Sequence, residues 1–294
     1  MQTENPIYGG QAVIEGVMMR NARAMAVAVR NPDGKIELFT QTLTGPLRGR
    51  IARTPFVRGV VGLVDAFGLG VRSLMYSASV AGGEEADYEG SLAWGTMAIS
   101  LMLGIGLFFL LPAALGQAGE EWVGLSVGAG NLLEGFARLG LVVGYIWVIG
   151  YVPDIRRIYG YHGAEHKTIH AFEADAELTP EAVARFPREH PRCGTAFLLV
   201  VVVLSVLIFA AFGPLPLLWR LGTRLLLLPV LASVAYEYLR LTARNMHLGF
   251  VRLIVRPTLV LQRLTTREPD EAMLAVAIAA FRAMQAVEEG DVPA

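Results

Sequence analysis

Long apolar segments separated by short polar ones fill the middle of this chain. Four of them approach the ~20 residues that a helix needs to cross the hydrocarbon core of a bilayer. The fourth is interrupted early by Arg220, Gly222 and Arg224, so it could begin only at Leu225. The pattern predicts a mainly α, polytopic helical membrane protein with about four spans. The expected spans are about 94–115, 132–152, 195–212 and 217–239.

Residues 55–80 are also apolar, but they carry charges at a fixed spacing. Arg58, Asp65 and Arg72 are seven residues apart and therefore lie near one face of a helix. A narrow polar face on an apolar helix is typical of a helix that lies in the plane of the membrane surface. A membrane span is the alternative, but three charges within the bilayer would be costly.

The first 54 residues predict a small β-containing segment. The two β-rich runs Ala24–Arg30 and Lys35–Thr42 flank the turn signal Asn31-Pro32-Asp33-Gly34, which indicates a β-hairpin. Before them lies the glycine-flanked apolar stretch GGQAVIEGVMMR, in which Glu15 is the one acid. A lone hairpin is only marginally stable, so we expect it to pack on the membrane-proximal helices or on another chain.

The last part of the chain predicts amphipathic helices. It is basic and amphipathic through Arg263, and Glu268-Pro269-Asp270-Glu271 then resembles a helix start, where proline and acids are favoured. The apolar stripe that follows indicates a helix that docks on the rest of the protein. Its members are Leu274, Ala277, Ile278, Phe281 and Met284.

These patterns divide the chain into four parts. We expect a β-containing segment over 1–54 and an in-plane helix with its linker over 55–90. A four-span membrane domain over 91–240 contains a polar segment at 153–194, and amphipathic helices occupy 241–294.

Basic residues predict how the chain is oriented. The net charge is only −1, but 22 of the 25 lysines and arginines lie in 1–90, 153–194 and 240–294, and none lies in the loop 116–131. By the positive-inside rule, both termini and the polar segment 153–194 are expected in the cytoplasm.

The polar segment concentrates the residues that could carry chemistry. It contains four of the five histidines and the single cysteine, Cys193. His162, His166, His170 and Glu173 follow one another at intervals of four, four and three residues, which places them on one stripe of a helix. Gly160 and Gly163 weaken that helix near His162.

This stripe matches a known metal-binding pattern. His162-Gly-Ala-Glu165-His166 has the form H-x-x-E-H, in which two histidines one turn apart bind a metal and the acid is the base. His190 and Cys193 offer a nitrogen and a sulfur ligand downstream. The sequence therefore predicts His162, His166, His190 and Cys193 as ligands of a divalent metal, with zinc as the candidate, and Glu165 as the catalytic base.

Two further acids are reserve ligands, and each of the motifs has a plainer interpretation. Glu173 and Glu237 could both reach the site, although Glu237 could instead pair with Arg240 or Arg244. Histidines on a cytoplasmic helix are often simply solvated, and short motifs also occur by chance.

Four stretches carry a family resemblance. GGQAVIEGVMMRN, YHGAEHKTIHAFE, HPRCGT and TTREPDEAMLAVAIAAF are similar to the YqhQ-like family of bacterial integral membrane proteins of unknown function. The members are loosely labelled as predicted metal-dependent enzymes. The resemblance covers nearly the whole chain and implies a multi-pass protein of the bacterial cytoplasmic (inner) membrane, but no settled activity.

Two functions follow as competing hypotheses. The first is a metal-dependent hydrolase at the cytoplasmic face, and the second is a non-catalytic scaffold or chaperone for other membrane proteins. A small transporter is a third possibility, disfavoured because the spans show few ionisable residues beyond Arg220, Arg224 and Glu237. Expected partners are membrane lipids and other membrane proteins or a second copy of the chain, and no nucleic acid is expected.

Overall fold

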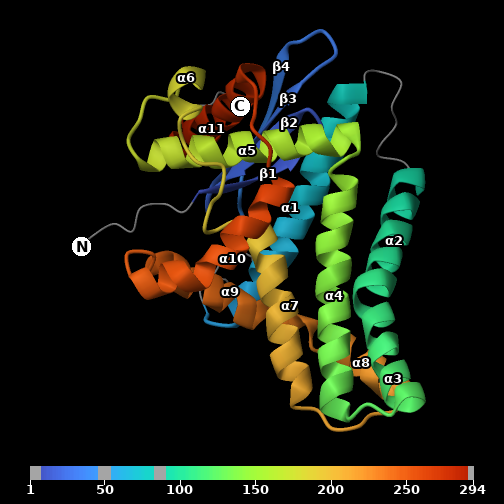
Figure 1. The fold of residues 1–294 in the computed structure, drawn as a ribbon. Helices are drawn as coiled ribbons and strands as arrows, with labels where there is room; N and C mark the ends of the chain where they lie inside the picture. The colour runs from blue at the N-terminus through green and yellow to red at the C-terminus, as the bar shows by residue number, and fades with distance from the viewer. Residues whose placement is uncertain (1–7, 46–53, 83–90, 291–294) are drawn as a thin grey trace.

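A small α/β module sits at one end of a helical bundle in the computed structural model (Figure 1). The structure describes residues 8–45, 54–82 and 91–290, without the side chains of 91–94. The module contains the strands β1 (Gly9–Val13), β2 (Gly16–Arg20), β3 (Ala24–Arg30) and β4 (Ile36–Thr42), which form one antiparallel sheet in sequence order. The predicted hairpin is β3–β4, and its pairing of Arg30 with Ile36 confirms it.

The sheet is buried on both faces, because successive side chains of a strand point to opposite sides. In β3, Ala24, Ala26 and Ala28 face one hydrophobic cluster, and Met25, Val27 and Val29 face another. The helices α5 (Pro153–Glu173) and α11 (Glu271–Glu289) cover the first face, and α1 (Val57–Gly82) covers the second. The two ends of the chain therefore share one core.

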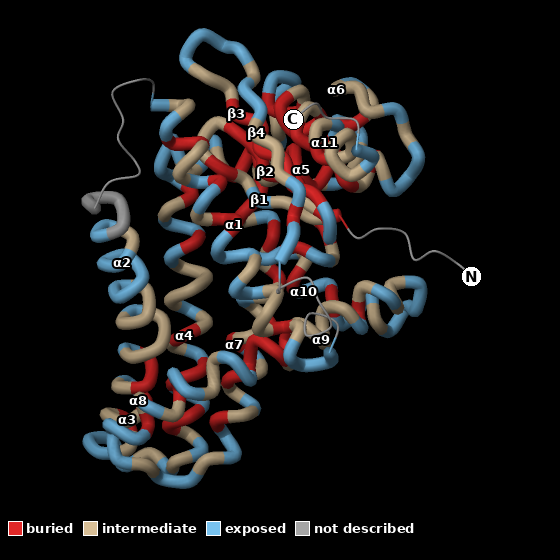
Figure 2. The backbone as a smooth tube through the Cα atoms, turned by 180° about the vertical axis from the view of Figure 1, so that it is seen from behind, coloured by how far each residue is buried: buried red, intermediate tan, exposed pale blue. Residues whose placement is uncertain are grey.

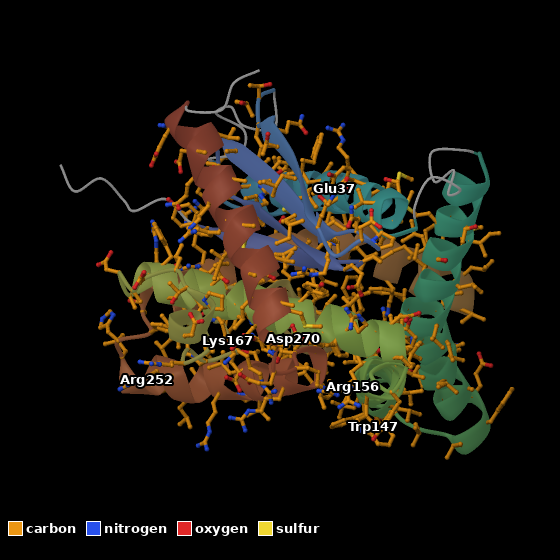
Figure 3. All side chains as sticks on the ribbon, turned by 90° about the horizontal axis from the view of Figure 1, so that it is seen from above. Glu37, Trp147, Arg156, Lys167, Arg252 and Asp270 are labelled. Atoms are coloured by element: carbon orange, nitrogen blue, oxygen red, sulfur yellow. The ribbon has the colours of Figure 1, made fainter. Side chains whose placement is uncertain are left out.

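The helix α11 docks as its apolar stripe predicts. Asp270 caps it, since its side chain accepts a hydrogen bond from the N–H of Met273 at 2.8 Å. All five residues of the predicted stripe are buried. Figure 3 shows α11 crossing over α5, with Asp270 at the start of α11.

The bundle contains the apolar helices. Among the described residues, three helical segments are long and apolar enough to cross a membrane: α1, the segment Gly95–Val123 and α4 (Val127–Ile149). There are four if the bent pair α8 (Leu217–Leu226) and α9 (Leu228–Arg244) is one span. The helix α7 (Gly194–Ala210) is also apolar but has only 17 residues.

The remaining elements complete the bundle and the module. The bundle also contains α2 (Ser91–Ile105), η3 (Gly106–Leu110), α3 (Leu111–Val123) and α10 (Gly249–Thr265). The short α6 (Pro180–Val183) belongs to the module.

The apolar side chains of α2 point outward, as expected for a helix that faces lipid. Leu101, Met102 and Leu103 are between 52% and 69% exposed. Figure 2 shows the contrast with the buried interior of the α/β module. Together with the apolar helices, this supports a membrane protein with three or four spans.

One predicted helix end is wrong. The first span was expected to end at about residue 115, but the helical path continues to Val123. A π-helical turn, η3, ends at Leu110, and Pro112 lies in the first turn of α3. A helix tolerates proline in its first turn because the missing N–H would have no helical partner there.

The charges of α1 are paired with protein groups. Arg58 pairs with Glu237 of α9, Asp65 accepts from Arg20 of β2 at 2.7 Å, and Arg72 donates to Gln41 of β4 at 3.0 Å. Pairing reduces the free-energy cost of placing these three charges within a bilayer, which was the argument against a span. The helix α1 also has the length and composition of a span. Its in-plane position stays a prediction.

A half-exposed ion pair links the sheet to α5. Arg157 donates to Glu15 at 2.6 Å, and Tyr161 donates to the same carboxylate at 3.2 Å. The hydrogen bond from Arg157 holds the pKa of Glu15 below its usual range, and it outweighs burial, which raises that pKa.

Acid should therefore weaken the module. Because the pKa of Glu15 is lower in the folded state, its stabilisation is present above the unfolded pKa and is lost as the pH falls through the folded pKa. The wild-type protein should lose thermal stability as the pH falls from about 5 to about 3, and Glu15→Gln should lose less. The expected difference in the free energy of unfolding is less than about 1 kcal/mol, because the ion pair is partly solvated. Equal pH slopes for wild type and variant would contradict this.

Candidate metal centre

The predicted histidine stripe lies on a single helix. His162, His166 and His170 all belong to α5, and the helix is unbroken at Gly160 and Gly163. These glycines are sites of close packing. A Cβ atom at Gly160 would lie 2.7 Å from the sulfur of Met273, and one at Gly163 would collide with the carbonyl oxygen of Arg267. The segment that precedes α11 can therefore lie directly on α5.

Gly163 should tolerate no side chain. Gly163→Ala would force apart α5 and the backbone at Arg267, and we expect a loss of about 1–3 kcal/mol, the usual cost of overpacking. Gly68→Ala in α1 is the matched control, because nothing lies within 4 Å of its added Cβ. Thermal unfolding in detergent measures both. A Gly163→Ala protein as stable as Gly68→Ala would contradict the packing.

The loop between α5 and α7 folds back over the histidine face of α5. The buried Lys167 fastens it, since its Nζ donates to the carbonyl of Ala184 at 2.7 Å and pairs with Glu268 at 2.5 Å. Figure 3 shows Lys167 beside the crossing of α5 and α11. Backbone carbonyls of this loop thereby reach the imidazole rings.

Three of the predicted ligands meet in one group. Ligand atoms of His162, His166 and Cys193 all lie within 4.8 Å of one another. The Nε2 atom of His162 is 3.2 Å from the Sγ of Cys193, and the two imidazole rings are 4.4 Å apart. Nitrogen and sulfur ligands of one tetrahedral zinc ion would be about 3.5 Å apart. The spacing fits a metal site.

Backbone carbonyls fix both rings in the tautomer that metal ligation requires. The Nδ1 atom of His162 lies 2.9 Å from the carbonyl oxygen of Thr265, and that of His166 lies 2.5 Å from the carbonyl oxygen of Arg188. A carbonyl can only accept, so each Nδ1 carries a proton, and in the neutral ring the lone pair is then on Nε2. Metal-ligating histidines show this same arrangement.

The third ligand lies at the start of the apolar helix α7. Cys193 is buried and is the N-cap residue of α7, where its Sγ accepts from the N–H of Thr195 at 3.4 Å. A cysteine sulfur is a soft ligand of the kind that zinc sites use. The candidate centre is thus joined directly to the bundle.

The fourth predicted ligand, His190, lies in a neighbouring group with His170 and Glu173. Burial lowers the pKa of His190 to about 4, so its ring is neutral. The backbone N–H of Arg192 donates to its Nδ1 at 3.3 Å, which places the proton on Nε2, 3.8 Å from Glu173. Arg192 also pairs with Glu173. Arg192 already engages the carboxylate of this group, which makes it the poorer metal site, although the buried Nε2 of His190 has no hydrogen-bond partner among the described residues.

The predicted base lies on the flank of the histidine stripe. Glu165 is buried, and its carboxylate packs beside Gly10 of β1, whose backbone N–H donates to it. Burial raises its pKa to about 7, against the opposing effects of His162 and of Gly10. Glu165 is not among the grouped ligand atoms, so its role as a base stays a prediction.

The second reserve ligand does not belong to the site. Glu237 of α9 pairs with Arg58 of α1, a partner that the sequence did not indicate. The sequence could not show this, because the two residues are 179 positions apart.

A charged network inside the bundle was missed. Glu134 of α4 is 1% exposed and binds Arg138 at 2.8 Å, Arg224 at 2.9 Å and Arg220 at 3.3 Å. Arg220 also binds Glu120 of α3 at 2.7 Å. The carbonyl of Phe108 in the π-helical turn accepts from Arg138 at 3.0 Å. The sequence could have indicated this network, since Glu134 and Arg138 are an oppositely charged pair one helical turn apart within the predicted second span.

Comparisons with known proteins agree with the resemblance found in the sequence. The family described as "Protein of unknown function (DUF1385)" matches residues 54–287. The chain is also similar to "Uncharacterized protein YqhQ" of Bacillus subtilis (strain 168), with 31% identity over 96% of this chain and 93% of that protein. No solved structure matches the chain significantly.

Proposed function

The chain belongs to the DUF1385 family, and from the geometry of its histidine–cysteine group we propose that it is a membrane-embedded metal-dependent hydrolase. One observation carries the proposal. Ligand atoms of His162, His166 and Cys193 lie within 4.8 Å of one another, and backbone carbonyls accept hydrogen bonds from the Nδ1 atoms of both rings, which leaves Nε2 as the nitrogen that can bind a metal.

The ligand number supports catalysis. His162, His166 and Cys193 would be three protein ligands, and catalytic zinc sites have three protein ligands and one open position, whereas structural sites have four. The bound ion would supply a Lewis acid that activates water. Zinc suits a mixed set of imidazole and thiolate ligands.

Other residues of the chain would orient the ligands and accept the proton. The carbonyls of Thr265 and Arg188 orient the two rings, and the N–H of Thr195 stabilises the sulfur. Glu165, buried against Gly10 and close enough to His162 for their charges to interact, would take up a proton from the reacting water. This assigns Glu165 the role of the acid in the H-x-x-E-H pattern.

Glu165→Gln separates catalysis from structure. We expect the variant to keep its metal, measured by elemental analysis after purification in detergent, and to fail to complement a deletion strain. Glu177→Gln is the matched control, because Glu177 is exposed on the loop after α5. If Glu165→Gln complements like Glu177→Gln, Glu165 is not the base. If wild type holds no metal, the scaffold function replaces the enzyme.

We also propose that the α/β module and both termini face the cytoplasm of a bacterial inner membrane. The support is the distribution of basic residues, since the loop 116–131 has none. Cysteines introduced at Glu177 and Glu121 report the two sides, because both positions are exposed and Cys193 is buried. An impermeant thiol reagent added to intact cells should label Glu121→Cys alone, and labelling of Glu177→Cys alone would reverse the orientation.

A further inference from the structure

The helix α10 has three distinct faces along its length. Its buried face, formed by Val255, Thr258, Gln262 and Thr265, packs against α7 and the loop that carries His190. A second face is apolar and exposed, and a third is basic. At about 100° of rotation per residue, the members of the three faces fall in three separate sectors around the helix axis.

The apolar face points away from the rest of the described protein. Its large side chains are well exposed, with Phe250 at 73%, Leu253 at 65%, Ile254 at 41% and Val260 at 52%. Such a continuous exposed apolar stripe indicates a surface that something covers. Nothing in the described part of the chain covers it.

The basic face consists of Arg252, Arg256 and Arg263 at intervals of four and seven residues. Arg263 pairs with Glu189 at 2.8 Å. Arg252 and Arg256 are exposed, and within the described residues neither has a hydrogen-bonding or ion-pair partner. Figure 3 shows Arg252 at the outer end of α10, away from Trp147 of α4.

The direction of α10 fits neither a span nor a solvated helix. It runs across the axes of α4 and α7 at the level where the bundle meets the α/β module (Figures 1 and 2). Its 17 residues include three arginines, which makes it a poor membrane span. A helix with one apolar and one basic face is typical of an element lying in the membrane interface.

We propose that α10 lies in the surface of the leaflet that faces the α/β module, with its apolar face in the acyl region and Arg252 and Arg256 bound to the phosphates of anionic phospholipids. Lipid is the occupant because α10 packs against α7 and α4 of the bundle, and because Arg252 and Arg256 on its basic face have no partner among the described residues. This inference is independent of the metal.

If the proposed metal-dependent function holds, the position of α10 also sets how deep the candidate metal centre lies relative to the membrane. The last turn of α10 makes hydrogen bonds to two histidines, His162 of α5 and His190 of the loop between α5 and α7. The carbonyl of Thr265 accepts from His162 at 2.9 Å, and Gln262 binds the backbone of His190 at both its N–H, 2.7 Å, and its carbonyl, 2.9 Å. The centre therefore lies close to the depth of the lipid headgroups.

A nitroxide scan of positions 250–261 in nanodiscs tests the position of α10. Single cysteines carry the label, and wild type treated in the same way gives the background from the buried Cys193. We expect dissolved oxygen to relax labels at 250, 253, 254 and 260 most strongly, and a water-soluble nickel complex to relax labels at 252 and 256 most strongly. Dominant relaxation by nickel at 250 and 253 would overturn the proposal.

The lipid preference is tested with matched double variants. Purification from equal mixtures of phosphatidylglycerol and phosphatidylcholine should leave wild type enriched in the anionic lipid. Arg252→Gln/Arg256→Gln should reduce the enrichment several-fold, since each arginine near an anionic surface contributes about a fivefold preference. Arg23→Gln/Arg185→Gln removes the same charge from exposed positions of the module. An equal reduction in both double variants would show general attraction by charge and contradict a site on α10.

Discussion

His166→Ala is expected to weaken metal binding by more than about 100-fold and to abolish complementation of a deletion strain. Residues that only orient a ligand already contribute 10–100-fold to metal affinity in comparable sites, so removal of a ligand should cost more. His166 is 1% exposed, and its Nδ1 is held by the carbonyl of Arg188, so its ring is fixed in place beside His162 and Cys193.

The matched control is the fifth histidine. His247 is exposed between α9 and α10, outside both histidine groups, and His247→Ala should keep the metal and complement fully. Metal content is measured on the purified proteins, and complementation in cells. If His166→Ala complements as well as His247→Ala, the catalytic hypothesis is wrong and the scaffold hypothesis is favoured.

Glu134→Leu is expected to destabilise the bundle by about 3–5 kcal/mol, the usual cost of leaving buried charges without their partner. Glu134 is the one carboxylate that binds Arg138, Arg220 and Arg224 together, and these arginines are at most 3% exposed. The network holds α8 against α4, so its loss should release the bent pair α8–α9 from the bundle.

Thermal stability in detergent and the yield of monodisperse protein measure the effect. Glu121→Gln is the control, because Glu121 lies on the exposed side of α3 and accepts a hydrogen bond from Gln117, one turn away. A Glu134→Leu protein as stable as Glu121→Gln would show that the network does not hold the bundle together. That result would favour a functional role for these charges, as is usual for ionisable residues within membranes.

Local pattern was enough to predict the elements, because periodicity and capping act over a few residues. The spacing of the α5 histidines, the Asn31–Gly34 turn and the cap at Asp270 each specify their structure within one or two turns of chain. The strands β1 and β2 were not predicted, because their glycines and methionines are weak strand formers and both depend on packing against α5 and α11.

The contacts that complete the candidate site come from distant segments. Thr265 is 103 residues from His162, and Gln262 is 72 residues from His190. A periodic pattern contains no information on which carbonyl will fix a ring, so the grouping of His162 and His166 with Cys193 but without His190 had to come from the structure. The same holds for Glu237, which pairs with Arg58 of α1.

X-ray absorption at the zinc edge of the purified, zinc-loaded protein tests the His162–His166–Cys193 centre most directly. The geometry predicts one sulfur ligand at about 2.3 Å and nitrogen or oxygen ligands at about 2.0–2.1 Å. Cys193→Ser should lose the sulfur shell and keep the nitrogen shell. A wild-type spectrum without sulfur, or a sulfur shell that survives in Cys193→Ser, would contradict the centre.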